Sequence, residues 1–137
     1  MARALFTSDA APCLKCHATG DPVRDRTATA PNFLFVKERL KADWTERWII
    51  DPQSISPGTS MPSGLFRKQN GRWVFSGPVP PSFEGYDGDH TDLLVRYMFQ
   101  LTPEEQRRAA GMMRAGSPPA RKPVVAARPK KQKTGSD

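Results

Sequence analysis

The chain has 137 residues, a length typical of a single domain. Its formal net charge is +7, and a hydrophobic fraction of 37% is combined with 14 prolines. No stretch approaches the roughly 20 apolar residues of a membrane-spanning helix, and no internal repeat is visible. The N-terminus lacks the apolar region and cleavage site of a secretory signal peptide.

The N-terminal residues predict two short helices, over 2–9 and 12–17. Pro12 disfavours a helical conformation at Ala11, so the first helix should end near Asp9. Proline is favoured at the first position of a helix, so Pro12 should begin the second one. The break places the next residues at the start of a new helical turn.

The second of these helices contains the sequence CLKCH. Cys13 and Cys16 are the only cysteines of the chain, and His17 follows at once. This spacing is typical of covalent haem attachment, because one turn places both sulfurs along one edge of a porphyrin and the histidine over its iron. Two alternatives are a structural zinc site, which would need His90 or a carboxylate as a fourth ligand, and a dithiol redox motif, which usually follows a strand that is not evident here. We therefore expect one covalent c-type haem, with His17 as an iron ligand.

Two further helices are predicted over 33–41 and 43–50. Asp43 is a suitable N-cap for the second, and Asp51-Pro52 should end it. Trp44 and Trp48 are four residues apart and so share a face, which is typical of a helix packed on a core. Alternatively, one indole N–H binds a haem propionate. The basic residues Arg39, Lys41 and Arg47 are interpreted as a solvated face, with pairing to haem propionates as the alternative.

A second axial ligand is expected because the iron of an electron carrier usually has a side chain on both faces. The candidates are Met61, Met98, Met112, Met113 and His90. Met61 is favoured because it lies in SPGTSMPSG, which has neither helical nor strand periodicity, so an apolar side chain there needs a special explanation. The alternative is a loop methionine that fills a gap in the packing. Met98 is interpreted as core, and His90 as a solvated histidine at a helix start.

An insertion is predicted over about 65–88. Asn70-Gly71 lies between FRKQ and RWVF, a pattern that strongly favours a two-residue β-hairpin over 65–75. A proline-rich loop follows the hairpin. We expect the hairpin to be a docking element that exposes Trp73 and Phe75.

The C-terminal half ends in two predicted helices, over 90–101 and 103–113, and a tail over 115–137. Leu94, Tyr97, Met98 and Leu101 share one face of the first helix and should pack against Leu5 and Phe6. The tail has six basic residues and one acid, four prolines and no aromatic residue. This composition predicts disorder. We expect the tail to act as an electrostatic tether to an anionic membrane or an acidic partner.

Several of these segments, in the same order, resemble a class I c-type cytochrome of the small bacterial kind. CLKCH resembles the haem attachment site, APNF at 30–33 the proline segment, PGTSMP at 57–62 the methionine loop, and DLLVRYMFQL the C-terminal helix. The segment over 36–52 is similar to cytochrome modules attached to respiratory membrane complexes. The insertion and the position of Phe6 depart from the family pattern.

The resemblance implies an all-α cytochrome c fold over 1–114, in which the terminal helices cross. It implies that the carbonyl of Pro31 fixes the His17 ring and that Met61 is the distal ligand. The function implied is single-electron transfer rather than enzymatic catalysis, with redox-partner proteins in a respiratory or photosynthetic membrane complex and no nucleic acid. The alternative is a haem-based sensor with an open distal site.

Attachment of c-type haem takes place in an extracytoplasmic compartment, so a periplasmic location is expected. Because no export signal is visible, we expect that the numbering begins after a removed segment or within a longer chain.

Overall fold

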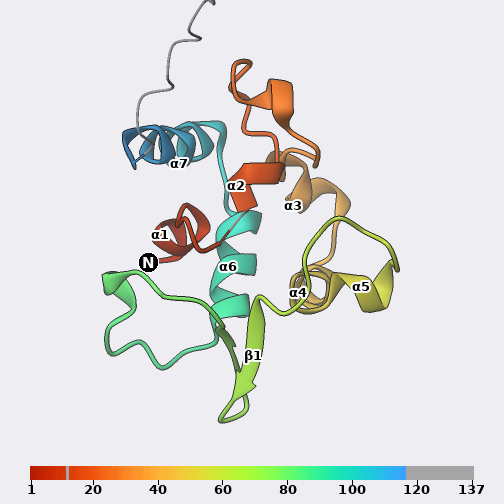
Figure 1. Cartoon of the computed structure of the whole chain (residues 1–137), viewed down its shortest axis with the longest axis vertical. Coiled ribbons are helices and arrows are strands. Elements are labelled where there is room, and N and C mark those ends of the chain that lie inside the picture. The colour runs from red at the N-terminus through yellow and green to blue at the C-terminus, as the bar shows by residue number, and fades with distance from the viewer. Residues whose placement is uncertain (12, 117–137) are drawn as a thin grey trace, which may run out of the picture.

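The computed structural model describes residues 1–11 and 13–116, which form a helix-rich fold with one small sheet (Figure 1). The α-helices are α1 (Ala2–Phe6), α2 (Cys13–Cys16), α3 (Val36–Arg39), α4 (Ala42–Ile50), α5 (Pro52–Ile55), α6 (His90–Phe99) and α7 (Pro103–Gly116). Three short 3-10 helices cover Asp25–Thr27, Phe33–Phe35 and Pro81–Phe83. The antiparallel strands β1 (Phe66–Gln69) and β2 (Arg72–Phe75) form the sheet. None of the helices in this part of the chain has the length and apolar character needed to cross a membrane.

Helix α6 lies at the centre of the molecule and contacts α1, α3, α4 and β2 (Figure 1). Its N-cap is Asp89, whose carboxylate accepts hydrogen bonds from the backbone N–H groups of Thr91 (2.8 Å) and Asp92 (3.1 Å). Such an N-cap satisfies donors that the first helical turn leaves without partners. Leu94 and Met98 are buried along the helix. The other elements are arranged around this buried face.

The predicted contact between the first helix and α6 is present. Phe6 is 1% exposed, and its ring meets Tyr97 edge to face with centroids 5.3 Å apart. A second edge-to-face contact, at 4.7 Å, joins Phe6 to Phe33. Helix α1 ends at Phe6 rather than near Asp9, and the chain turns after it: Ser8 N–H donates to the carbonyl of Leu5, and Ala11 N–H donates to Ser8 Oγ. Phe6 therefore connects α6 to the segment that follows the C-x-x-C-H motif.

The predicted hairpin is present, with Phe66 opposite Phe75. Asn70 and Gly71 both have positive φ, 51° and 78°, as the favoured two-residue turn requires. The expectation that Phe75 is exposed is wrong: its side chain is 3% exposed, and Trp73 is half-buried. The reason is that β2 lies against the start of α6, which removes this side of the hairpin from solvent.

His90 is also placed differently from the prediction of a solvated histidine. It is 7% exposed, and the ring of Phe83 meets it edge to face at 4.8 Å. The backbone N–H of Phe75 donates to His90 Nδ1 at 3.1 Å, while that of Trp73 donates to Asp89 Oδ2 at 2.7 Å. These two hydrogen bonds attach β2 to the start of α6. His90 thus has a structural role in joining the hairpin to the central helix.

The remaining differences concern element boundaries. The predicted helix over 33–41 is a 3-10 turn followed by α3, and α4 begins after Lys41 without a side-chain cap from Asp43. Helix α7 continues to Gly116, so the first residues of the predicted tail are helical. The prediction of disorder over the rest of the tail, 117–137, lies outside the described residues, as does Pro12, the predicted start of the second helix.

Candidate functional site

The C-x-x-C-H motif forms the single turn of α2 and the residue after it. Buried Leu14 anchors the turn, whereas Cys13 is half-buried and Cys16 is exposed. Both cysteines are free thiols. The His17 N–H donates to the carbonyl of Cys13 at 3.0 Å, which extends the turn to the histidine. The backbone therefore presents two thiols and one imidazole from a single turn.

The pKa of the Cys13 thiol does not favour dithiol redox chemistry. Burial raises the pKa of Cys13 to about 11, and a hydrogen bond to the backbone opposes this shift only in part. The nucleophile of a dithiol oxidoreductase needs the opposite shift, because only the thiolate attacks. The dithiol alternative therefore finds no chemical support at Cys13.

The His17 ring is held by a hydrogen bond to the carbonyl oxygen of Pro31, the residue that the family resemblance implied. The distance from His17 Nδ1 to Pro31 O is 2.7 Å. A carbonyl can only accept, so Nδ1 carries the proton and the neutral ring keeps a lone pair on Nε2. Hydrogen bonding of one imidazole nitrogen to a backbone carbonyl is the usual way in which proteins orient a metal-binding histidine.

The chain around His17 and Pro31 explains this geometry. Residues 16–18 run beside residues 29–31, with a parallel bridge between His17 and Ala30. Ala18 N–H donates to the Ala30 carbonyl, and Ala30 N–H donates to the Cys16 carbonyl, both at 3.0 Å. These bonds bring the next carbonyl, that of Pro31, to the ring. The contact is therefore built by the backbone rather than by a flexible side chain.

Phe33 supports the imidazole from one face. The two rings are stacked with centroids 4.1 Å apart and an interplanar angle of 25°. Burial lowers the pKa of His17, and the hydrogen bond to Pro31 opposes this shift only in part. The neutral imidazole that metal ligation requires is thus the favoured form at neutral pH.

The predicted distal residue, Met61, lies in a loop that Gln53 of α5 holds together. The Gln53 side-chain amide donates to the carbonyl of Thr59, and its oxygen accepts from Gly58 N–H at 3.0 Å. Ser63 closes the loop by donating to Asp51 Oδ1 at 2.7 Å. Sequence reasoning missed Gln53. The one feature of the sequence that points to Gln53 is its position, as a polar residue just before a loop rich in proline, glycine and serine.

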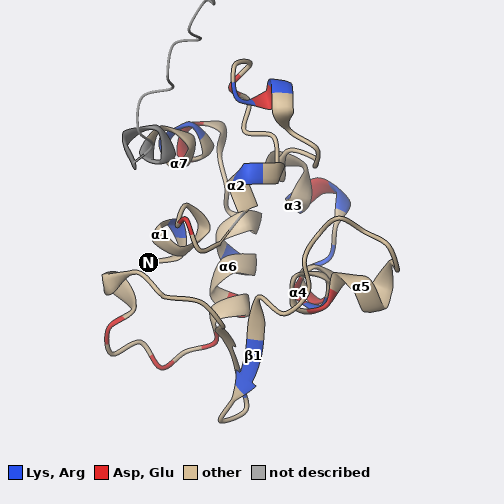
Figure 2. Cartoon of the chain, viewed as in Figure 1, with Lys and Arg blue, Asp and Glu red and all other residues tan. Residues whose placement is uncertain are grey.

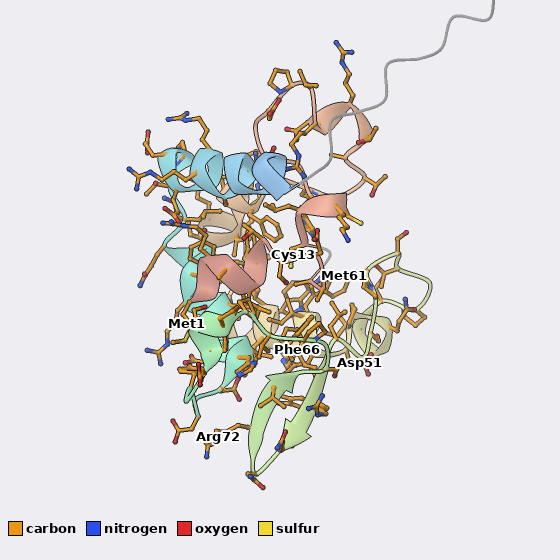
Figure 3. The ribbon with its side chains drawn as sticks, turned by 60° about the vertical axis from the view of Figure 1, so that its left-hand side comes forward. Met1, Cys13, Asp51, Met61, Phe66 and Arg72 are labelled. Carbon is orange, nitrogen blue, oxygen red and sulfur yellow. The ribbon has the colours of Figure 1, made fainter. Side chains whose placement is uncertain are left out.

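Met61 is half-buried and packs against the hydrophobic core, as do Cys13, Leu34, Trp48 and Leu65. Figure 3 shows the labelled Cys13 and Met61 in the region between α2 and the loop that carries Met61. Cys13 and Met61 are thus both half-buried side chains that pack against the same hydrophobic core.

The two tryptophans of α4 share a face, as predicted. Their rings are stacked with centroids 5.2 Å apart and planes 13° apart, and both side chains are half-buried. Trp48 packs on the core. Neither indole N–H donates to a protein group within residues 1–11 and 13–116, so the packing interpretation and the propionate interpretation are both compatible with this geometry.

The donor set suits a haem iron better than a zinc ion. Across the described segments, no three His, Cys, Asp or Glu side chains are grouped as a metal site would require. A c-type haem needs fewer convergent donors: two thiols for covalent attachment and an imidazole with a free Nε2. Cys13, Cys16 and His17 carry groups of these types, and Met61 carries a thioether.

Charged residues are found on many elements of the described part of the chain. Figure 2 shows Lys and Arg distributed over several elements, including α2, α3 and β1, and interspersed with acids. Arg39 lies over the exposed ring of Phe35, with its guanidinium carbon 4.5 Å from the centroid.

No protein-family model, curated protein or solved structure matches this chain.

Proposed function

We propose that this protein is a single-electron carrier with one covalent c-type haem, and that its fold is a cytochrome c fold with a hairpin insertion. The observation that carries the proposal is the hydrogen bond between His17 Nδ1 and Pro31 O, beside two free thiols with haem-attachment spacing. The stacking of Phe33 on the same ring adds a second constraint on its orientation.

Each site residue has a role that follows from its chemistry. The Cys13 and Cys16 thiols would add across the two vinyl groups, forming one C–S bond each while the thiol hydrogen passes to the other vinyl carbon. His17 would bind the iron through Nε2, and the Met61 sulfur would occupy the opposite axial position. When bound, the haem supplies a one-electron ferrous–ferric couple.

The protein environment would favour electron transfer over catalysis. His17 and Met61 would both hold the iron through side chains, an arrangement that is typical of electron carriers rather than of haem catalysts. The carbonyl on His17 Nδ1 increases the electron donation of the ring. The partners would be redox proteins of an extracytoplasmic, membrane-bound electron-transfer complex, towards which the basic C-terminal tail would tether the domain.

Optical spectroscopy tests this proposal. The full chain should be produced in a periplasm that contains haem-attachment machinery, with Cys13→Ala/Cys16→Ala as the matched control. We expect the colour of the wild-type protein to remain with the polypeptide after denaturation and acid-acetone extraction, and that of the control to be lost. Haem that passes into the solvent from the wild-type protein would refute covalent attachment.

The sensor alternative makes a different prediction. A haem with an open distal site binds carbon monoxide readily in the ferrous form, whereas a site closed by Met61 does not. A carbon monoxide titration of the reduced wild-type protein therefore distinguishes the two functions. Met61→Ala provides the positive control, because it opens the distal position.

A further inference from the structure

Helix α7 contains a buried amide whose presence the hydrophobic core does not explain. Gln106 is 1% exposed, and its Nε2 donates to the carbonyl oxygen of Thr19. Among the described residues, Gln106 Oε1 is the buried side-chain N or O atom that has no hydrogen-bond partner. Burying a half-satisfied amide is unfavourable, and leucine or methionine would fill the space without this penalty. The hydrogen bond from Gln106 Nε2 to the Thr19 carbonyl therefore needs an explanation other than core packing.

Thr19 lies two residues after His17 and belongs to a tightly bonded turn. Its backbone N–H and its hydroxyl both donate to Asp25 Oδ1, at 2.8 Å and 3.2 Å, and Gly20 N–H donates to Asp25 Oδ2 at 2.8 Å. The Thr19 carbonyl accepts from Gln106 instead. Gln106 thus connects α7 to the chain immediately after the proposed iron ligand.

A short path of hydrogen bonds leads from Thr19 to the ring of His17. The residue before Thr19, Ala18, donates its N–H to the Ala30 carbonyl at 3.0 Å. The residue after Ala30, Pro31, provides the carbonyl that accepts from His17 Nδ1. A displacement of Thr19 would therefore move the backbone that positions the acceptor for the ring.

A second link fastens α7 to the same motif. Arg24 donates from Nη2 to the Leu14 carbonyl in α2 at 2.9 Å, and from Nη1 to the Ala110 carbonyl in α7 at 3.4 Å. Figures 1 and 3 show α7 at the same end of the molecule as α2. Helix α7 therefore holds the turn that carries the cysteines as well as the turn that follows the histidine.

We propose that Gln106 is a positioning residue for His17, acting from α7 through the Thr19 carbonyl to maintain the hydrogen bond between His17 Nδ1 and Pro31 O. The inference rests on the proposed function, in which His17 binds iron. Loosening of this hydrogen bond would reduce electron donation by the ring and so favour the ferrous state. Gln106 would thereby keep the reduction potential lower than it would be without the amide.

The test compares two α7 variants of the full-length, haem-loaded protein. Gln106→Met keeps the side-chain length and removes the donor to Thr19. Glu105→Ala is the matched control, because it removes the contacts of α7 with Arg3 and Tyr97 but none with Thr19. The melting temperature, the reduction potential, and the hydrogen-exchange rates of Ala18 N–H and His17 Nδ1–H are measured for each.

We expect Gln106→Met to raise the reduction potential and to accelerate both exchange rates about tenfold, the order of effect of one lost hydrogen bond. We expect Glu105→Ala to lower the melting temperature while leaving the potential and the two rates unchanged. The proposal is overturned if Gln106→Met changes only the melting temperature, or if the two variants shift the potential equally.

Amide exchange in the wild-type protein and haem analysis provide two further tests. In the wild-type protein, the side-chain amide protons of Gln106 should exchange far more slowly than those of exposed Gln100; equal rates would overturn the proposal even if Gln106→Met fails to fold. Absence of covalent haem from the wild-type protein would refute the proposed function. The exchange of Ala18 N–H would still decide whether Gln106 holds this segment, because it needs no haem.

Discussion

The Nδ1 atom of His17 lies 2.7 Å from the carbonyl oxygen of Pro31, although the two residues are 14 positions apart in the chain. Phe33, two residues after Pro31, stacks on the same ring. The segment after Ala30 therefore fixes both the tautomer and the plane of the imidazole, which is the preorganisation that an axial ligand needs.

Phe33 should be critical for stability because it joins the His17 ring to Phe6. We expect Phe33→Ala to lower the free energy of unfolding by about 3–5 kcal/mol, the usual cost of deleting a buried phenylalanine ring. Phe35→Ala is the matched control: it is 44% exposed and should cost about 1 kcal/mol or less. Urea denaturation measures both, and equal losses would contradict this account of the ring.

Met61 should be the distal ligand. We expect Met61→Ala to abolish the weak long-wavelength sulfur-to-iron band of the ferric protein and to lower the reduction potential, because thioether ligation favours the ferrous state. Met98→Leu is the control, since Met98 is buried in α6 and the substitution conserves volume. A sulfur band that survives Met61→Ala would exclude this assignment.

The loop around Met61 should depend on Gln53. Gln53→Leu removes the amide contacts with Thr59 and Gly58, so the loop would lose the bonds that limit its motion. We expect the sulfur-to-iron band to disappear at a lower denaturant concentration than the bulk unfolding transition. Gln69→Leu, at an exposed position of β1, serves as the control. Coincident transitions in both variants would show that Gln53 does not hold the loop.

Stability should fall as the pH decreases from about 7 to 5, in part because of His90. Burial lowers the pKa of His90, against the opposing charge of Asp89, so below the ordinary histidine pKa of about 6.5 the unfolded chain binds more protons than the folded one. The stability that neutral His90 contributes is therefore present above pH 6.5 and lost as the pH falls through the folded pKa.

His90→Asn isolates this contribution, because the Asn Oδ1 can accept from Phe75 N–H without titrating. We expect the melting temperature of this variant to depend less on pH between 7 and 5. Some dependence of the melting temperature on pH should remain, because burial also lowers the pKa of unligated His17 and so destabilises the fold as the pH falls. Identical slopes for wild type and variant would show that His90 does not titrate in this range.

The hairpin should contribute to stability as well as to any docking. Phe75→Ala should lower the free energy of unfolding by about 3–5 kcal/mol, because the ring is 3% exposed and packs edge to face on Phe66. Gln69→Ala, on the same hairpin but exposed, should change it by about 0.5 kcal/mol or less. Thermal or urea unfolding measures both variants. A loss of less than about 1 kcal/mol for Phe75→Ala would instead indicate that the hairpin is peripheral to the core.

The local features of this fold could be predicted from sequence because their causes lie within a few residues. Asn70-Gly71 supplies the two positive φ angles of the hairpin turn, and periodic apolar residues mark the buried face of α6. The C-x-x-C-H spacing brings two thiols and an imidazole onto one turn once the segment is helical, as it is in α2. The role of the Pro31 carbonyl as the acceptor for His17 was also predicted, although only through the resemblance of APNF to the family's proline segment.

Only the tertiary structure decided which polar residues are buried and what they bind. His90 follows three acidic or glycine residues and looks solvated in the sequence, yet β2 and Phe83 cover it. Gln53 and Gln106 have no distinguishing local sequence pattern. Each acts by donating a hydrogen bond to a backbone carbonyl in another segment, that of Thr59 or Thr19. Hydrogen bonds from these side chains to distant backbone groups form only when the elements have packed together. Hydrophobic periodicity predicts which face of a helix is buried, but it does not predict which element covers that face.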